Sequence, residues 1–160
     1  MKLRDYIGYM IGFILFVILV PLIMWRLSGD VKPVPVQIIF FVIMAAAGIS
    51  LSIWSIIYMK NVGKGNPMDA FNHEIAPRTV NLMTEGPYRL CRNPMLLGVL
   101  IYYAGIVICL GTWQSVTVFV IYFMIIMVQV RREEERLERD FGEDYREYCR
   151  RTKKLIPYLW

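Results

Sequence analysis

Two short groups of charged residues, one on either side of a hydrophobic hairpin, are the part of this chain best suited to chemistry. Arg92-Asn93-Pro94 precedes the hairpin, and Arg132-Glu133-Glu134-Glu135 follows it. Antiparallel neighbouring helices pack about 8–10 Å apart, so a chain that goes out and returns brings its two ends together. We therefore expect a guanidinium and a carboxylate cluster at one face of the protein, close enough to hold one small charged ligand.

The hairpin consists of two apolar segments, Met95 to Leu110 and Trp113 to Val130, joined by Gly111-Thr112. Two earlier segments, Tyr6 to Trp25 and Val36 to Met59, also lack Lys, Arg, Asp and Glu. A helix needs about 20 apolar residues to cross a bilayer, and roughly 17 at the least. With 57% hydrophobic residues, the chain is predicted to be an all-α polytopic membrane protein with about four transmembrane helices.

The whole chain is expected to form one membrane-embedded domain. Its parts are two N-terminal spans, a cytoplasmic loop, the hairpin, and a cytoplasmic tail, at residues 1–60, 61–93, 94–131 and 132–160. A signal peptide is the alternative interpretation of the first segment, because Lys2 and Arg4 resemble the basic start of one. The length of the apolar run and the lack of a small-residue cleavage site favour a membrane span.

The distribution of Lys and Arg predicts the orientation, because cytoplasmic loops collect these residues near helix ends. They lie before the first segment, between the second and third, and after the fourth, while Arg26 and Lys32 flank the first connection. Both termini and the charged groups are therefore expected on the cytoplasmic side. This pattern accounts for the net charge of +5, and no basic patch interleaved with aromatic residues indicates a nucleic-acid partner.

The segments around the hairpin carry further local signals. Glu85-Gly86-Pro87-Tyr88 predicts a turn that delivers Tyr88 and Arg92 to the third span, and Pro94 suits the first turn of that helix. In the second span, small residues predict a face for close helix packing; they are Ala45, Ala46, Ala47, Gly48, Ser50, Ser52 and Ser55.

The tail is predicted to be an amphipathic helix that continues from the fourth span. Its apolar residues recur at spacings of four, four and three, which places them on one face; they are Leu137, Phe141, Tyr145 and Tyr148. We expect both tyrosines to form the core of this helix rather than to contact a ligand. Gly142 is expected to break or bend the helix, and Ile156-Pro157 to end it.

Neither the cysteines nor the histidine indicates a metal site. Cys91, Cys109 and Cys149 lack metal-type spacing, and His73 has no partner at ligand spacing. Cys91 and Cys149 are expected to face a reducing cytoplasm. We therefore predict no metal and no disulfide.

Several short motifs follow one another along the chain: Gly63-Lys64-Gly65-Asn66-Pro67, Gly86-Pro87-Tyr88, Arg92-Asn93-Pro94, Glu133-Glu134, Phe141-Gly142, Tyr145, Tyr148 and Ile156-Pro157. Together they resemble the isoprenylcysteine carboxyl methyltransferases and their relatives, the phospholipid N-methyltransferases. The resemblance covers over half of the chain, and the order and spacing carry it rather than any single motif. The glycine-rich loop and Asn93 resemble prokaryotic members, which implies a prokaryotic cell membrane.

The resemblance implies S-adenosylmethionine as methyl donor at the cytoplasmic face, and a lipid-type or prenylated acceptor that enters from the bilayer. It implies that Arg92, Glu133 and Glu134 are catalytic, and that the donor-binding residues are Tyr88, Arg92, Asn93, Pro94, Met95, Leu96, Leu97, Glu133 and Glu134. These types fit the donor, because carboxylates suit its ammonium, a guanidinium its carboxylate, and apolar side chains its adenine. Glu133 or Glu134 could take the proton of an amine acceptor, whereas a carboxylate acceptor would need no base.

Two positions depart from the family pattern. Asn93 stands where histidine is usual, and Leu96 where tyrosine is usual, which removes a hydroxyl group. A sterol-type or polyprenol reductase using NADPH and a non-catalytic membrane protein of the same fold remain open as alternatives. The tail lacks the C-x-x-K-Y-G stretch of such reductases, and the spans lack the charges expected of a transporter. The acceptor, the choice among O-, N- and S-methylation, and the oligomeric state remain open.

Overall fold

The computed structural model describes residues 10, 13–64 and 79–156, and every regular element within them is a helix. The all-α prediction is confirmed. In chain order the elements are η1 (Ile14–Leu19), α2 (Val20–Ser28), α3 (Pro35–Tyr58), η2 (Met59–Gly63), η4 (Gly86–Arg89), α4 (Pro94–Leu110) and α5 (Trp113–Arg151). Of these, η1 and η2 are π-helical and η4 is a 3₁₀ helix.

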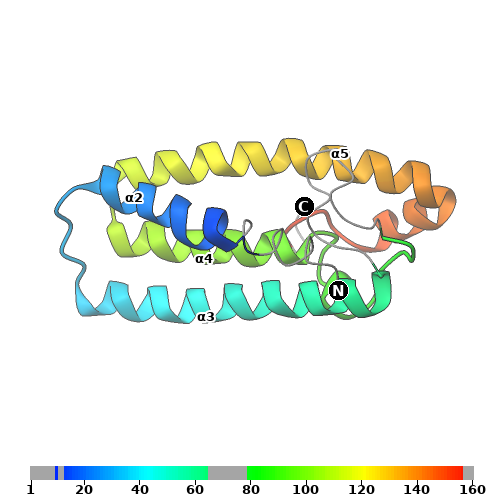
Figure 1. The fold of residues 1–160 in the computed structure, drawn as a ribbon, viewed down its shortest axis with the longest axis horizontal. Coiled ribbons are helices and arrows are strands. Elements are labelled where there is room, and N and C mark those ends of the chain that lie inside the picture. Colours follow the sequence, from blue (N-terminus) through cyan, green and yellow to red (C-terminus); the bar gives the residue numbers. More distant parts are fainter. Residues whose placement is uncertain (1–9, 11–12, 65–78, 157–160) are drawn as a thin grey trace.

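The long helices lie side by side with α4 at the centre (Figure 1). α4 packs against α3, α5 and α2, and α2 also contacts α5. Two helices are long and apolar enough to cross a bilayer, namely Pro35–Gly63, which includes η2, and Trp113–Arg151. The helix over Ile14–Ser28 and the helix α4 are shorter and apolar. The start of the first predicted segment, at Tyr6, lies outside the described residues.

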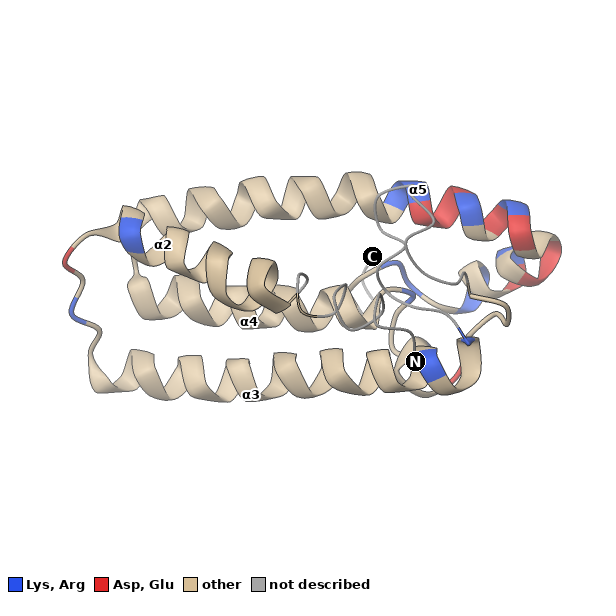
Figure 2. Cartoon of the chain, viewed as in Figure 1, with Lys and Arg blue, Asp and Glu red and all other residues tan. Residues whose placement is uncertain are grey.

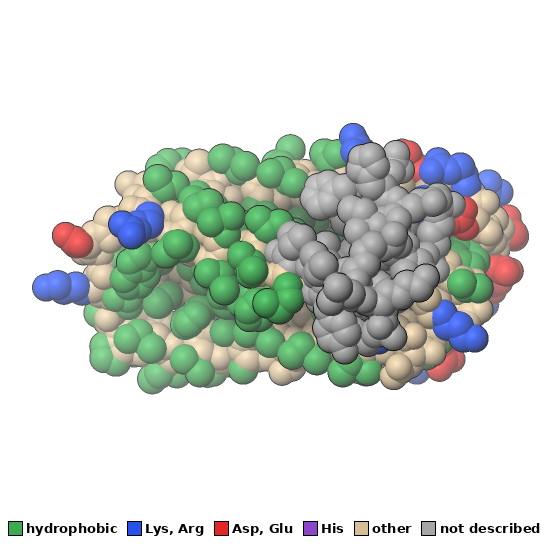
Figure 3. All heavy atoms as spheres, in the orientation of Figure 1, with side chains coloured by type: hydrophobic (Ala, Val, Ile, Leu, Met, Phe, Trp, Pro, Cys, Tyr) green, Lys and Arg blue, Asp and Glu red, His purple; other side chains and the backbone are tan. Residues whose placement is uncertain are grey.

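The surface separates into an apolar middle and two charged ends. Among the residues that the structure describes, Figure 2 shows Lys, Arg, Asp and Glu at both ends of the bundle and none along its middle. Figure 3 shows hydrophobic side chains spread over the surface of that middle part. One end carries Arg26, Asp30 and Lys32, and the other carries the charged half of α5. An apolar surface of this extent suits a lipid environment rather than water.

Helices α3 and α4 approach closely where two glycines meet. A Cβ atom on Gly48 would lie 2.3 Å from the carbonyl oxygen of Gly98, and one on Gly98 would lie 2.4 Å from that of Gly48. Beside them, the hydroxyl of Ser52 donates to the carbonyl of Met95 at 3.0 Å. The predicted packing face is therefore confirmed for Gly48 and Ser52 and for the buried Ser55, but it is wrong for the exposed Ala46, Ala47 and Ser50.

The start and end of α4 follow the sequence signals. Pro94 lies in the first turn of α4, as predicted. Before it, Gly86 has φ +62°, and the ring of Tyr58 occupies the space of a side chain, since an added Cβ would lie 2.6 Å from it. At the other end α4 stops at Gly111, which has φ +60°, and the hydroxyl of Thr112 accepts a hydrogen bond from the backbone of Ser115 in α5.

Helix α5 is interrupted once. The backbone at Gly142 is not helical, with φ 55° and ψ −123°, and α5 reverses its direction at the charged end of the bundle (Figure 1). The sequence predicts a break at this residue. Because the chain folds back, Tyr145 and Tyr148 pack with Tyr88 and with two methionines, Met59 and Met83, in a buried cluster separate from the core of the bundle.

Candidate functional site

The two charged groups that flank the hairpin are in contact. The Nε and Nη2 atoms of Arg92 both donate to Oε1 of Glu134, at 2.9 and 2.6 Å. Both side chains are mostly buried, with 12% and 16% of their surfaces exposed. Burial by itself lowers the pKa of Arg92, but the hydrogen bonds and the charge of Glu134 outweigh it, and the net pKa is raised.

Arg92 and Asn93 also bind the chain that follows α5. The Nη1 atom of Arg92 donates to the carbonyl of Thr152, and the backbone N–H of Arg92 donates to the carbonyl of Lys153 at 2.9 Å. The amide of Asn93 donates to the carbonyl of Lys154, also at 2.9 Å. All three guanidinium nitrogens of Arg92 therefore donate within the protein in this conformation.

The three consecutive glutamates have three different surroundings. Glu133 lines a cavity and lies 3.7 Å from the guanidinium of Arg136. Glu134 binds Arg92 and also accepts from Nζ of Lys154 at 2.6 Å. Glu135 is exposed. Within one turn of helix, one carboxylate thus lies at a cavity, the next in an ion-pair network and the third in solvent.

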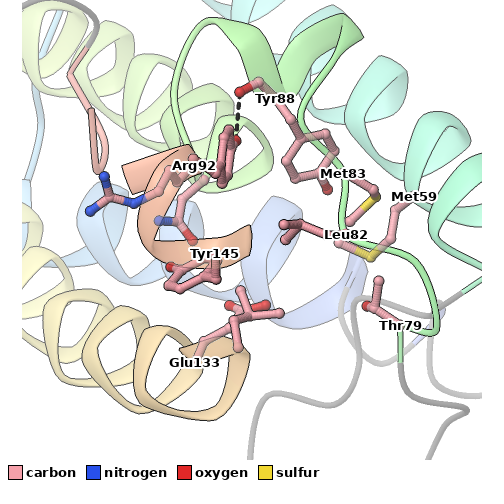
Figure 4. A pocket seen from close by; sticks show the side chains of 11 residues that line it. Met59, Thr79, Leu82, Met83, Tyr88, Arg92, Glu133 and Tyr145 are labelled. Carbon is pink, nitrogen blue, oxygen red and sulfur yellow. Dashed lines mark hydrogen bonds between the residues drawn. The ribbon is translucent and has the colours of Figure 1, made fainter. Parts of the chain in front are cut away.

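The cavity lies where the apolar bundle meets the charged end. Its volume is about 30 Å³, which is room for about one water molecule. Figure 4 shows Glu133, Tyr88 and Tyr145 around it, on three different segments, while the guanidinium of Arg92 points away from its centre. The residues that line it are Met59, Thr79, Leu82, Met83, Tyr88, Arg92, Asn93, Glu133, Leu137, Tyr145 and Tyr148.

Two tyrosine hydroxyls at this cavity are buried and have no hydrogen-bond partner among the described residues, those of Tyr88 and Tyr145. The hydroxyl of Tyr148, in contrast, donates to the carbonyl of Tyr88 at 2.6 Å. An unpaired buried hydroxyl costs about 1–3 kcal/mol, so two of them in one cavity are well placed to bind a polar ligand.

Burial is the main cause of the raised pKa values in this cluster. It raises the pKa of Tyr88, with a further contribution from the charge of Glu133. It raises the pKa of Tyr148, and that of Tyr145 together with the charge of Glu134. The nearby thiol of Cys149 raises the pKa of Tyr145 further, although the Tyr145 hydroxyl and this thiol do not meet the geometry of a hydrogen bond. All three tyrosines are therefore neutral hydrogen-bond donors at physiological pH.

Cys91 is fully buried beside this cluster. Burial raises the pKa of its thiol to about 11, although a backbone hydrogen bond from Asn93 and the charge of Arg92 both lower this pKa. A thiol with such a pKa is a poor nucleophile at neutral pH. In the described ranges no three His, Cys, Asp or Glu residues are grouped to hold a metal ion, and His73 lies outside these ranges.

Only some of the predicted site residues line the cavity, namely Tyr88, Arg92, Asn93 and Glu133. Leu96 and Leu97 instead pack against the core of the bundle, and the carbonyl of Met95 binds Ser52 of α3. Pro94 is buried at the start of α4. The first turn of α4 therefore faces the other helices of the bundle. The apolar walls of the cavity come from other residues, which are Met59, Leu82, Met83 and Leu137.

Most of the additional lining residues have no distinctive sequence signal. Met59, Thr79, Leu82 and Met83 belong to no motif. Tyr145 and Tyr148 do, because their spacing places them on the apolar face predicted for the tail. They form a buried core as expected, and they also line the cavity. The remainder of the glycine-rich motif, Gly65-Asn66-Pro67, and Pro157 lie outside the described residues.

Comparison with known proteins gives a family match over most of the chain. The sequence profile of the phospholipid methyltransferase family matches residues 36–144. Protein-S-isoprenylcysteine O-methyltransferase B of Arabidopsis thaliana is 32% identical over 79 residues, which are 49% of this chain and 40% of that protein. The protein-S-isoprenylcysteine O-methyltransferase of Schizosaccharomyces pombe is 24% identical over 106 residues, 64% of this chain and 45% of the relative.

Another relative has a different name. The cobalt-zinc-cadmium resistance protein CzcN of Cupriavidus metallidurans is 31% identical over 78 residues, 49% of this chain and 36% of the relative. The matches thus span less than half the length of each of these three relatives. No solved structure matches the chain significantly.

Proposed function

This chain belongs to the phospholipid methyltransferase family, and we propose that it transfers a methyl group from S-adenosylmethionine to a lipid-type acceptor at the end of the bundle that carries Glu133. One observation carries the proposal: a carboxylate, two unpartnered tyrosine hydroxyls and apolar walls meet in one cavity beside the apolar bundle. These groups suit the ammonium, the polar ribose and adenine atoms and the adenine ring of the donor, whereas the guanidinium of Arg92 points away from the cavity centre.

The donor fits the chemistry of the cavity. Glu133 would hold its ammonium group, and the hydroxyls of Tyr88 and Tyr145 would bind polar atoms of its ribose or adenine. Met59 and Met83 supply apolar, polarizable contacts for the adenine ring. Ligand pockets have volumes of about 300–1,000 Å³, so the cavity of about 30 Å³ must widen when the donor binds.

When bound, the donor supplies an activated methyl group. The chain then has to hold the acceptor in line with that group and keep water away. Glu133 is the residue placed to accept a proton if the acceptor is an amine. Arg92 and Glu134 act by position, because their polar atoms bind each other and the chain after α5.

The acceptor reaches the site from the bilayer. Support for this comes from the apolar surface of the bundle (Figure 3) and from relatives whose names include isoprenylcysteine methyltransferase. The proposed topology has four spans, with both termini and the site on the cytoplasmic side. It places Arg131 and Arg132 at the cytoplasmic boundary of the fourth span, where the positive-inside rule favours them.

Ligand binding to the purified protein in detergent tests this function. Thermal unfolding is measured with S-adenosylmethionine, with its demethylated product, and with NADPH. Stabilisation by the first two alone is expected, followed by transfer of an isotope-labelled methyl group into a lipid extract, detected by mass spectrometry. Stabilisation by NADPH alone, or by none of the three, would contradict the proposal.

A further inference from the structure

The short segment that follows α5 is bound along its backbone by the residues that precede α4. Arg92 donates to the carbonyls of Thr152 and Lys153, through its side chain and its backbone respectively. The side chain of Asn93 donates to the carbonyl of Lys154. Hydrogen bonds to successive backbone carbonyls fix this segment in one position, although it is not part of a helix.

Lys154 adds a side-chain contact to this arrangement. Its Nζ lies 2.6 Å from Oε2 of Glu134, while Arg92 occupies Oε1 of the same carboxylate. The exposed fractions are 23% for Lys154 and 16% for Glu134, so water screens this pair less than it would a surface pair. Next in the chain, Leu155 is fully buried in the core of the bundle.

The segment and the cavity are connected through the end of α5. Tyr145 and Tyr148 lie between Gly142, where α5 reverses, and the bound segment that begins at Thr152. Both tyrosines line the cavity, as do Arg92 and Asn93. The position of the two rings is therefore determined at one side by the reversal and at the other by the attachment of the segment.

We propose that Lys154 is a positioning residue of the donor site. By binding Glu134 it attaches the chain after α5 to the start of α4, and this attachment holds Tyr145 and Tyr148 at the cavity. Lys154 touches no reacting group itself, and it does not line the cavity. Its effect on the donor rests on the proposed function, whereas the attachment is a property of the fold that can be measured separately.

The adjacent lysine supplies a matched control. Lys153 has an exposed side chain, and only its backbone takes part in the attachment. Lys154→Met and Lys153→Met remove the same charge one residue apart, so any general effect of net charge is shared by both. Lys154→Arg retains the cation and is expected to restore the behaviour of the unmodified protein.

Thiol labelling measures the attachment without reference to activity. Cys149 is partly buried in the last turns of α5, and Cys91 is fully buried before Arg92. Local opening of this region exposes both thiols. With a maleimide and mass spectrometry that resolves each cysteine, Lys154→Met should be labelled several-fold faster than the unmodified protein, and Lys153→Met at the same rate. Equal rates in the two variants would overturn the attachment.

Donor affinity tests the positioning role. Because misplaced tyrosines no longer make their hydrogen bonds to the donor, the Kd for S-adenosylmethionine should rise by roughly tenfold in Lys154→Met. It should stay unchanged in Lys153→Met and Lys154→Arg. Faster labelling with an unchanged Kd would overturn the positioning role. If the unmodified protein binds no donor, the proposed function fails and the positioning role with it, while the labelling rates still decide the attachment.

Discussion

The hydroxyl of Tyr148 donates a buried hydrogen bond of 2.6 Å to the backbone carbonyl of Tyr88, 60 residues earlier in the chain. This bond joins the folded-back end of α5 to the 3₁₀ helix η4 that precedes α4. Both residues line the cavity. The bond therefore fixes the distance between two of its walls.

Tyr148→Phe is expected to lower the stability of the protein, whereas Tyr145→Phe is expected to lower its affinity for the donor without loss of stability. Tyr148→Phe leaves the carbonyl of Tyr88 without its partner, and should lower the free energy of unfolding by about 1–3 kcal/mol. Tyr145→Phe removes a hydroxyl that has no partner, so stability should be unchanged or slightly higher while the affinity for S-adenosylmethionine falls. Chemical unfolding in detergent and donor titration measure the two quantities. A Tyr145→Phe protein that binds the donor normally would remove this hydroxyl from the site.

Gly142→Ala should weaken donor binding through the backbone. At φ 55° and ψ −123° a side chain strains the chain by about 1–3 kcal/mol, and the strain is relieved if α5 continues straight. Tyr145 and Tyr148 would then leave the cavity. No atom lies within 4 Å of an added Cβ, so steric overlap plays no part.

Gly29→Ala is the control for Gly142→Ala. Gly29 also has a positive φ, +72°, and open space around its Cβ position, but it lies in the connection between α2 and α3 at the opposite end of the bundle (Figure 1). It should lose some stability and keep full donor binding. Equal loss of binding in both variants would show that strain, rather than the reversal of α5, is responsible.

Gly48→Ala should separate α3 from α4. The added Cβ would meet the backbone oxygen of Gly98 at 2.3 Å, and backbone cannot move aside as a side chain can. Overpacking of this kind costs about 1–3 kcal/mol or more. Ala47→Val, on the exposed side of α3, adds more volume at the neighbouring position. Thermal unfolding in detergent should show a lower midpoint for Gly48→Ala only, and equal midpoints would contradict the close packing of these helices.

The sequence predicts the arrangement better than the individual contacts. Apolar length and the turn at Gly111-Thr112 are local signals, and they predict the hairpin that brings Arg92 to Glu134. The break at Gly142 is also local, since a glycine within a polar helix marks a weak point. These features depend on a few neighbouring residues and can be derived from them.

The division of roles among the glutamates could not be derived in the same way. Glu133, Glu134 and Glu135 are chemically identical, and which one faces the cavity depends on the rotation of α5 about its axis. That rotation is determined by packing against distant residues such as Arg92 and Lys154. Leu96 and Leu97 illustrate the same limit, because their motif places them near the site while helix packing turns them toward the bundle core.

The central claim, that the cavity beside Glu133 binds S-adenosylmethionine, is tested most directly by comparing Glu133→Gln with Glu135→Gln. Both variants remove one carboxylate from the same turn of α5, but only Glu133 lines the cavity. A hydrogen bond to a charged group contributes about 1.5–3 kcal/mol, which corresponds to about 10- to 100-fold in Kd. Isothermal titration should show that loss for Glu133→Gln and none for Glu135→Gln. Equal affinities in the two variants would contradict the account.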